Sequence, residues 1–202
     1  MAETVALIDY GAGNLHSVRN ALAAAGAEGV VVTADPETVR RADRIVLPGV
    51  GAFGAAMRQL RVTPGLIEAL DEAVLEQARP FLGVCVGMQL MAETGEEHGS
   101  HRGLGWLPGT VRALVPSADM KVPHMGWNDV RPTRPHPLIE AGEAYFLHSF
   151  AYEGEGVIAD TDHGGSVTAA IGRDNLAGVQ FHPEKSQRYG LALLSRFLTW
   201  RP

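Results

Sequence analysis

Apolar and polar residues alternate along the first half of the chain in a pattern that predicts strands separated by helices. Short apolar runs bounded by glycine, proline or small polar residues indicate buried strands at residues 5–9, 30–33, 44–47 and 81–84. Segments with helical spacing or composition follow these runs, at residues 15–25, 36–42, 52–60, 66–78 and 87–92. This alternation is typical of a parallel sheet that is covered by helices on both faces.

After residue 93 the pattern changes to short strands with little helix between them. A polar stretch, EEHGSHRG at residues 96–103, predicts a loop. Strands are predicted around six apolar or aromatic positions, namely Val111, Val122, Tyr145, Val157, Val167 and Leu176. A last helical pattern spans residues 189–200. We predict an α/β fold with an open, mostly parallel sheet flanked by helices and a strand-rich second half.

The length and composition favour a single domain over residues 1–202. The chain is 46% hydrophobic and 20% charged, which is enough to bury a full core. Its apolar runs are far shorter than a membrane span, and its start lacks the features of a secretory signal, so we expect a cytoplasmic protein. A formal net charge of −6 and the absence of a basic cluster exclude nucleic acid as an expected partner.

The chain contains one cysteine, Cys85, in the stretch FLGVCVGMQL at residues 81–90. A single thiol can form neither an internal disulfide nor a thiolate metal site. Functional groups of open parallel sheets collect at the carboxyl ends of strands, where Cys85 is predicted to lie. The G-x-C-x-G spacing of residues 83–87 resembles a tight turn that presents a nucleophile beside helix amide groups. An inert, buried cysteine is the alternative that this motif alone leaves open.

A candidate base lies near the other end of the chain, in GVQFHPEKS at residues 178–186. His182 follows an apolar strand, and Glu184 comes two residues later, with Pro183 between them. In an extended segment held by proline, residues two apart project to the same side. The spacing therefore suits a Cys–His–Glu relay in which Glu184 orients the imidazole. A histidine and a glutamate on the surface at a strand end are the alternative interpretation.

The other histidines and glycines do not indicate a metal or a cofactor. His98 and His101 lie beside two glutamates but lack the regular ligand spacing of a structural metal site. The stretch YGAGN resembles half of a dinucleotide-binding fingerprint, but His16 occupies the position of the third glycine. We therefore predict no metal and no cofactor. The YGAGN loop is expected on the same rim of the sheet as Cys85.

Taken together, FLGVCVGMQL and GVQFHPEKS resemble the class I, or triad-type, glutamine amidotransferases. Four further stretches resemble, within that class, the glutaminase subunits of imidazole glycerol phosphate synthase in histidine biosynthesis. They are PGVGAF, PHMGWN, YFLHSF and HPEKSQRYG. The likeness covers essentially the whole chain, and it implies a flavodoxin-like fold and a glutaminase activity.

The resemblance implies that Cys85 attacks the side-chain amide of glutamine, giving a glutamyl thioester and ammonia. His182, held by Glu184, would protonate the leaving nitrogen and then activate water. The oxyanion donors would be the backbone N–H groups of Val50 and Val86. Glutamine contacts are implied at Gly49, Gly51, Gln89, Glu93, Ser149 and Phe150, with Gln89 and Glu93 in the helix that follows the cysteine. Phe150 stands where the family has tyrosine, so a main-chain contact is expected there.

The same resemblance implies a partner, a separate (β/α)₈ barrel cyclase that consumes the ammonia. Such a barrel needs roughly 250 residues, which this chain does not have to spare. Family positions on the docking face match Asn14, Trp127, Tyr145 and Lys185, although ordinary core packing is the alternative for Trp127. Glycine on both sides of Val50 permits a flip of its peptide, which the cyclase substrate would bias.

Two other classes of protein share parts of this pattern. A stand-alone cysteine hydrolase, such as a γ-glutamyl hydrolase or a small peptidase, would work without a partner. A non-catalytic regulatory relative would keep the fold and lose a member of the triad, which the intact Cys85, His182 and Glu184 argue against. Hydrolysis of glutamine with and without the cyclase distinguishes these classes.

Overall fold

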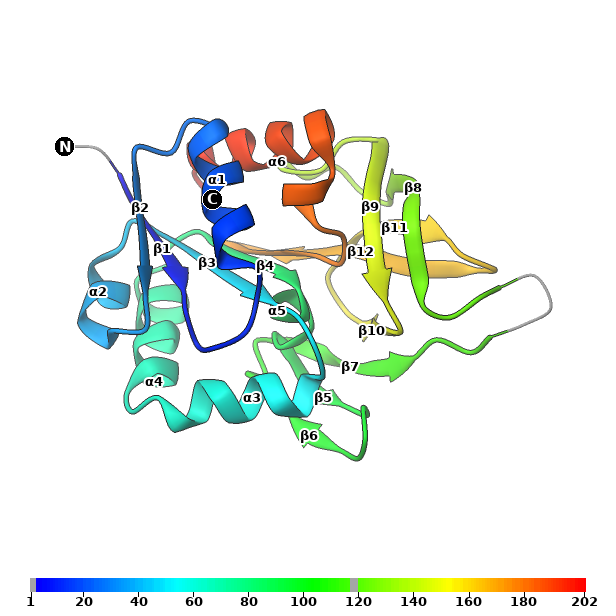
Figure 1. Cartoon of the computed structure of the whole chain (residues 1–202), viewed down its shortest axis with the longest axis horizontal. Coiled ribbons are helices and arrows are strands. Elements are labelled where there is room, and N and C mark those ends of the chain that lie inside the picture. The colour runs from blue at the N-terminus through cyan, green and yellow to red at the C-terminus, as the bar shows by residue number, and fades with distance from the viewer. Residues whose placement is uncertain (1–2, 117–119) are drawn as a thin grey trace.

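The computed structural model describes residues 3–116 and 120–202. Its larger sheet consists of β1 (Thr4–Ile8), β2 (Gly29–Thr33), β3 (Arg44–Gly49), β4 (Phe81–Cys85), β8 (His124–Pro132), β9 (Gly142–His148), β11 (Val157–Asp162), β12 (Ser166–Arg173) and β13 (Leu176–Val179). Within the described residues its nine strands run in the order β2-β1-β3-β4-β13-β12-β11-β8-β9 (Figure 1). The first five strands pair in parallel, and the other four continue antiparallel. The parallel part has the strand order of flavodoxin, which confirms the predicted α/β class.

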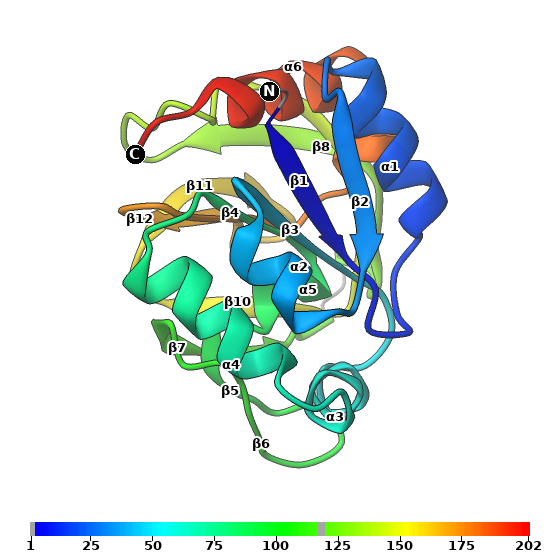
Figure 2. The same cartoon turned by 90° about the vertical axis from the view of Figure 1, so that its left-hand side faces the viewer.

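Helices cover both faces of the parallel strands. They are α1 (Leu15–Ala24), α2 (Pro36–Arg41), α3 (Phe53–Val62), α4 (Leu66–Asp71) with a π-helical turn η1 (Glu72–Glu76), α5 (Val86–Gln89), a 3₁₀ turn η2 (Pro183–Lys185) and α6 (Gln187–Thr199). Figure 2 shows α1 and α6 together on one side of the strands and α2 with α4 on the other. Each longer helix buries one apolar stripe, such as Val18 and Leu22 of α1, because only that face meets the sheet. None of the described helices is long and apolar enough to cross a membrane.

A smaller sheet packs beside the first. It consists of β5 (Ala92–Gly95), β6 (His101–Arg102), β7 (Leu107–Ala113) and β10 (Phe150–Gly154), in the order β10-β7-β5-β6. Its buried residues Leu107 and Tyr152 belong to the same apolar cluster as Phe81 of the larger sheet. The Trp106 ring meets the Phe81 ring edge-on at 4.9 Å between centroids. The two sheets therefore share one continuous core.

The predicted order of strands and helices in the first half is confirmed, but the helix predicted at residues 87–92 is wrong. It ends after one turn, and the chain enters β5 at Ala92. The carbonyls of Leu90 and Met91 accept hydrogen bonds from the N–H groups of Leu104 and Leu107, so a later segment takes the acceptors that a second helical turn would use. Two boundaries also differ from the prediction. The polar loop contains the short strand β6, and the strand expected around Val122 begins at His124.

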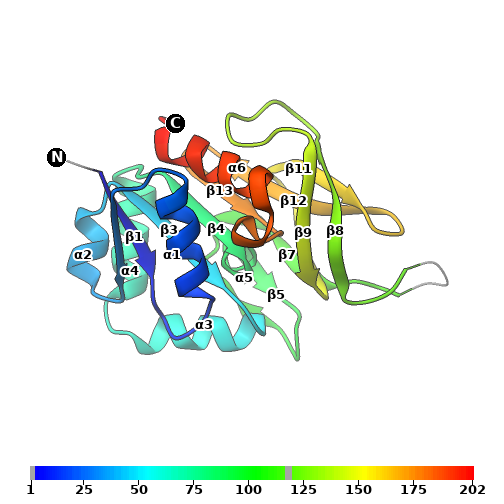
Figure 3. The same cartoon turned by 45° about the horizontal axis from the view of Figure 1, so that its top comes forward.

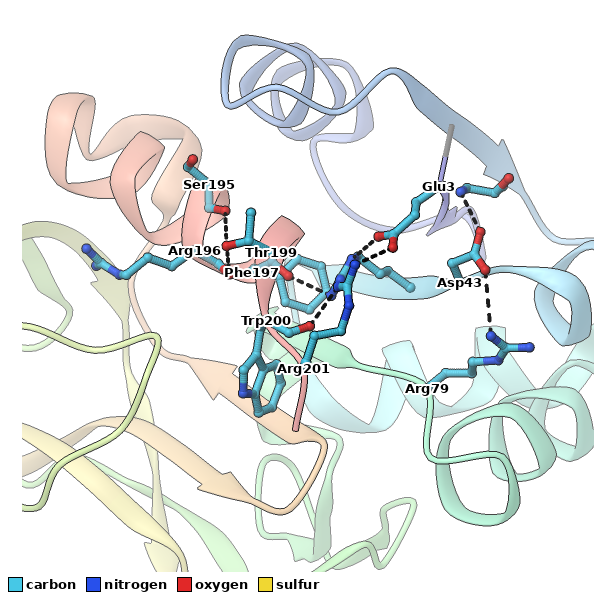
Figure 4. Close-up of polar contacts among 11 residues, drawn as sticks. Glu3, Asp43, Arg79, Ser195, Arg196, Phe197, Thr199, Trp200 and Arg201 are labelled. Atoms are coloured by element: carbon cyan, nitrogen blue, oxygen red, sulfur yellow. Dashed lines mark hydrogen bonds and ion pairs between the residues drawn. The ribbon is translucent and has the colours of Figure 1, made fainter. Parts of the chain in front are cut away.

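A buried arginine joins the amino ends of the parallel strands to the end of the chain. The Arg44 guanidinium donates from Nη1 to the Phe197 carbonyl at 2.7 Å and from Nε to Glu3 at 3.0 Å. Glu3 also accepts a hydrogen bond from Arg201 (Figure 4). A buried charge is costly unless it is paired and hydrogen-bonded, and here each requirement is met. This cluster lies at the end of the sheet opposite to Cys85, which closes β4 at its carboxyl end.

Candidate active site

Cys85 occupies a strained turn between β4 and α5. Its backbone has φ 54° and ψ −114°, a conformation that residues other than glycine rarely adopt. Three glycines allow the turn to pack this closely. A Cβ on Gly87 would lie 1.9 Å from the Leu47 carbonyl oxygen, one on Gly49 would lie 2.6 Å from the Gly87 nitrogen, and one on Gly83 would lie 2.7 Å from the Gly87 oxygen. The G-x-C-x-G spacing is therefore a steric requirement of a turn that projects the thiol beyond the strand.

The thiol faces a cavity of about 360 Å³ at the carboxyl ends of the parallel strands. Figure 3 shows α5 and the segment leading into α6 at this end of the sheet. The structure brings most of the predicted site residues to the cavity wall, namely Val50, Gly51, Cys85, Val86, Gln89, Ser149, Phe150, His182 and Lys185. Gly49 lies directly behind the wall, paired with Cys85 in the β3–β4 register. The cavity is the size of a small-molecule site.

His182 and Glu184 form a buried pair at the edge of this cavity. His182 Nδ1 lies 2.8 Å from Glu184 Oε1, and the two side chains are 6% and 2% exposed. Burial lowers the pKa of His182, but its interactions with Cys85 and Glu184 outweigh burial and raise the pKa to about 9. The imidazole is thus poised to hold a proton between the sulfur and the carboxylate. Cys85, His182 and Glu184 come together from opposite ends of the chain.

The extended conformation predicted for residues 182–184 is wrong beyond His182. His182 itself is extended, but Pro183 begins the 3₁₀ turn η2. Proline suits the first position of a helix because its missing N–H would have no partner there. Ser186 fixes the turn by donating to the His182 carbonyl at 2.6 Å and accepting from the Tyr145 N–H at 2.9 Å. Glu184 therefore reaches His182 from inside a turn.

Two glutamines lie behind the sulfur. The Gln180 amide is fully buried and donates to Cys85 Sγ at 3.7 Å. Its Oε1 accepts from Gln89 Nε2 at 3.0 Å, and the same nitrogen donates to the Phe150 carbonyl at 3.0 Å. Sequence reasoning missed Gln180. The available signal was a polar residue in the otherwise apolar run of residues 176–181, two positions before His182.

The prediction that Glu93 lies in the helix that follows Cys85 is wrong. It lies exposed on β5 and takes no part in the cavity wall. Glu97 lines the cavity instead, and its Oε2 accepts the N–H of Phe53 at the start of α3 at 2.8 Å. The premature end of α5 moves the acidic side chain at the cavity four positions along the chain. Glu97 is the second site residue that sequence reasoning missed.

The loop after β3 forms another part of the wall. Val50 is 46% exposed, and Gly51 has φ +86° with no atom near the position of a Cβ. The two preceding residues, Pro48 and Gly49, are held more firmly, because the Tyr10 hydroxyl donates to the Pro48 carbonyl at 2.9 Å. Tyr10 comes from the YGAGN stretch, which therefore lies on the same rim as Cys85, as predicted. The loop is anchored at Pro48 and open beyond it.

Three of the predicted docking residues form one surface beside the cavity, which we call the Trp127 patch. Trp127 and Tyr145 are opposite each other in the β8–β9 register, with ring centroids 6.2 Å apart. Lys185 places Nζ 5.6 Å from the Tyr145 ring centroid and also lines the cavity. Trp127 is 47% exposed, so core packing is the wrong interpretation of this residue. Asn14 is the N-cap of α1, where its side chain accepts the Ser17 N–H.

The described residues contain no group of three or more His, Cys, Asp or Glu side chains arranged to hold a metal ion. The cavity instead has a thiol, an imidazole and a carboxylate beside backbone N–H groups. Such a set supports nucleophilic attack by sulfur on a carbonyl carbon and proton transfer by the imidazole.

The fold is that of the class-I glutamine amidotransferases. Residues 6–199 match the family model described as "Glutamine amidotransferase class-I". Among solved structures, the chain is similar to PurLQS from Thermotoga maritima, with a TM-score of 0.75 and 19% identity over 98% of this chain and 99% of that one. This likeness concerns the fold.

Curated relatives narrow the assignment. Imidazole glycerol phosphate synthase subunit HisH of Zymomonas mobilis is 61% identical over 100% of this chain and 98% of that protein. The protein of the same name from Rhodopseudomonas palustris is 51% identical over 98% of this chain and 100% of its own length. The chain belongs to the HisH family within the class-I glutamine amidotransferases.

Proposed function

We propose that this chain hydrolyses L-glutamine to glutamate and ammonia and delivers the ammonia to a separate cyclase subunit of imidazole glycerol phosphate synthase. The observation that supports this most is the meeting of Cys85 with the buried His182–Glu184 pair at one cavity. The family description supplies glutamine as the substrate, and the relatives' names, as subunits of imidazole glycerol phosphate synthase, support a partner subunit. We also propose that residues 1–202 form a single cytoplasmic domain.

The chemistry follows from the positions of the three side chains. His182 holds the thiol proton while the Cys85 sulfur attacks the amide carbon of glutamine. The imidazolium returns it to the amide nitrogen, the C–N bond breaks, and ammonia leaves a glutamyl thioester on the sulfur. His182 then takes a proton from water, whose oxygen attacks the thioester and releases glutamate. Glu184 holds the ring in the correct tautomer throughout.

The oxyanion of each tetrahedral intermediate requires hydrogen-bond donors. We assign this role to the backbone N–H groups of Val86, at the start of α5, and Val50, in the open part of the PGVG loop. One such donor contributes about 3–4 kcal/mol to the transition state. A rotation of the Val50 peptide, which the neighbouring Gly49 and Gly51 permit, therefore changes the rate by two to three orders of magnitude.

The cavity wall offers complementary groups for the amino-acid end of glutamine. We assign the α-ammonium to the Glu97 carboxylate, in place of Glu93, and the main chain of Ser149 and Phe150 to the remaining polar contacts. Phe150 has no side-chain hydroxyl, and its carbonyl already accepts two hydrogen bonds, from Gln89 and His148, which fix its main chain at the wall.

The cyclase would dock on the Trp127 patch, which lies next to the cavity. Ammonia that escapes into water is protonated and loses its nucleophilicity, so transfer requires a partner that covers the site. Exposed Trp and Tyr side chains are typical of interface hot spots. Lys185 belongs both to the patch and to the cavity wall, so the docked partner would border the ammonia source.

The test is glutamine hydrolysis by the purified chain with and without the cyclase subunit. We expect the cyclase to raise the rate and Cys85→Ser to reduce it by at least about 10³-fold. A γ-glutamyl electrophile should add its mass to Cys85 in the wild type and leave Cys85→Ser unchanged. Full activity without any partner would favour a stand-alone hydrolase, and hydrolysis by Cys85→Ser at the wild-type rate would exclude the thioester route.

A further inference from the structure

Two buried histidines outside the triad form a hydrogen-bonded chain behind the cavity. His148 Nδ1 lies 2.9 Å from the Phe150 carbonyl oxygen, and His148 Nε2 lies 3.0 Å from His124 Nδ1. His124 Nε2 in turn lies 3.1 Å from the Asn128 amide nitrogen. His124 and His148 face each other across the β8–β9 pair, and both are almost completely buried.

The partners fix the proton positions of both rings. A carbonyl only accepts, so His148 carries its proton on Nδ1 and donates to Phe150. Its Nε2 is then an acceptor, and His124 must donate from Nδ1. His124 Nε2 is left to accept from Asn128, whose Nδ2 also donates to the Asp162 carbonyl at 2.8 Å. Every donor in the chain points towards the cavity.

The ring of His124 is held rigidly. The Phe146 ring stacks on it at 4.6 Å with an interplanar angle of 15°, and the His163 ring stacks at 4.0 Å with an angle of 18°. His163 is itself held, since its Nε2 lies 2.7 Å from the Lys121 carbonyl oxygen. A ring clamped between two others cannot turn to offer its second nitrogen to His148 without disturbing the packing.

The same hydrogen-bond network continues from the Phe150 carbonyl through Gln89 and Gln180 to the Cys85 sulfur. Phe150 O accepts from both His148 and Gln89, and the second N–H of Gln89 fixes Gln180 Oε1. With its oxygen fixed, the Gln180 amide must present its N–H groups on the opposite side, where Nε2 lies 3.7 Å from Cys85 Sγ. The orientation of both glutamines thus depends on the position of one carbonyl oxygen.

We propose that His124 and Gln180 are positioning residues of the glutaminase reaction. His124 donates to Nε2 of His148 and so reinforces the tautomer, also favoured by the Phe150 carbonyl, in which His148 holds that carbonyl on the glutamine wall, and Gln180 directs an N–H at the attacking sulfur. The inference rests on the proposed function. Without His124, only the Phe150 carbonyl favours the proton on Nδ1 of His148, and molecules with the proton on Nε2 would have a lone pair on Nδ1 facing the Phe150 oxygen. The carbonyl would move, and the binding wall with it.

Matched variants separate this role from simple packing. His124→Leu removes both ring nitrogens, whereas His124→Asn keeps an amide N–H near the position of Nδ1. We expect His124→Leu to raise KM for glutamine about tenfold, the effect of roughly one hydrogen bond, and His124→Asn to restore most of it. Gln180→Met should lower kcat about tenfold with less effect on KM, because the sulfur loses its donor. His136→Asn serves as the control, because His136 is half-buried and lies outside the hydrogen-bonded chain of His124 and His148.

The tautomer provides a readout that does not depend on catalysis. Nitrogen-15 spectra of the imidazoles should show His148 with its proton on Nδ1 in the wild type and in His124→Asn, and a shift towards Nε2 in His124→Leu. A wild-type His148 protonated on Nε2 would overturn the proposal, as would unchanged KM and spectra in His124→Leu. If His124→Leu does not fold, the wild-type spectrum and the kcat of Gln180→Met decide. Absence of glutamine hydrolysis by the wild type with its cyclase would refute the proposed function, while the spectra would still test the His124–His148 chain.

Discussion

The Nδ1 atom of His182 and the Oε1 atom of Glu184 lie 2.8 Å apart, and neither side chain is more than 6% exposed. The second oxygen of this carboxylate, Oε2, is buried and has no hydrogen-bond partner among the described residues. The negative charge of Glu184 is therefore directed almost entirely at the imidazole. A carboxylate in this situation orients the ring and stabilises its protonated form.

Glu184→Gln should lower kcat for glutamine hydrolysis by about 10³–10⁴-fold while the fold persists. The amide keeps the shape of the carboxylate but removes its charge and allows the wrong imidazole tautomer. Steady-state rates with the cyclase present measure the loss, and circular dichroism and thermal unfolding check the fold. A folded variant that retains most of its activity would show that Glu184 is not the orienting group.

The pKa of His182, raised from 6.5 to about 9, predicts a pH dependence of stability on the alkaline side. A raised folded-state pKa means that the native state holds the proton more tightly than the unfolded state. The resulting stabilisation is fully present below pH 6.5 and is lost as the pH rises through about 9. Cys85→Ala removes one source of the shift and should flatten the curve. Urea unfolding across this range provides the measurement, and identical slopes in the two proteins would contradict the assignment.

His148 and His124 predict the opposite behaviour in acid. Burial, followed by the neighbouring imidazoles, lowers the pKa of His148 to about 4 and that of His124 to about 3. The groups that face them are His163 and His182, which add positive charge when protonated. Each ring then costs up to about 1.4 kcal/mol of unfolding free energy per pH unit below 6.5. His124→Asn should remove one such contribution, and an equally steep acid slope in that variant would argue against a neutral His124.

Gly87→Ala should destabilise the protein more than a glycine replacement in open space. The new Cβ would lie 1.9 Å from the Leu47 carbonyl oxygen, so β3 or the Cys85 turn must move. We expect a loss at or above the upper end of the ~1–3 kcal/mol that is typical of overpacking. Gly26→Ala is the control for backbone strain alone, since Gly26 has a positive φ, +108°, and no atom within 4 Å of a Cβ, whereas Gly87 does not have a positive φ. Chemical denaturation compares the two, and equal losses would contradict the steric argument.

Trp127→Ala should weaken binding of the cyclase without affecting the fold of the free chain. Truncation of a large aromatic hot spot costs about 2 kcal/mol or more, which corresponds to roughly a 30-fold rise in Kd. Val62→Ala, at a residue that is 70% exposed on α3, is the control for loss of exposed apolar surface. Calorimetry with the cyclase measures both. Equal affinities for Trp127→Ala and the wild type would place the docking surface elsewhere.

The parallel half of the fold could be predicted because its signals are local. Runs such as residues 45–47 and 81–84 are apolar throughout, as strands buried on both faces must be, and glycine or proline marks their ends. The same locality identified Cys85, which directly follows such a run, and His182, which follows the mostly apolar run 176–181. A strand end and its turn are fixed by the residues within them.

The remaining parts of the site depend on contacts between distant segments. Leu90 and Met91 continue a helical pattern, and only the return of Leu104 and Leu107 to their carbonyls ends α5 and brings Glu97 to the cavity in place of Glu93. The hydrogen-bond network that links Asn128 to Gln180 likewise requires the β8–β9 register that places His124 opposite His148. Neither relationship produces a periodic pattern that can be recognised in a single sequence.

The Arg44 cluster marks the end of the molecule that is suited to attachment of a label or a tether. Glu3, Arg44 and Arg201 meet at the amino ends of the parallel strands, whereas the cavity opens at their carboxyl ends. A tag, fluorophore or surface tether attached next to Arg201 would therefore project away from the Trp127 patch. Immobilisation through that end leaves the catalytic rim free for a cyclase in solution.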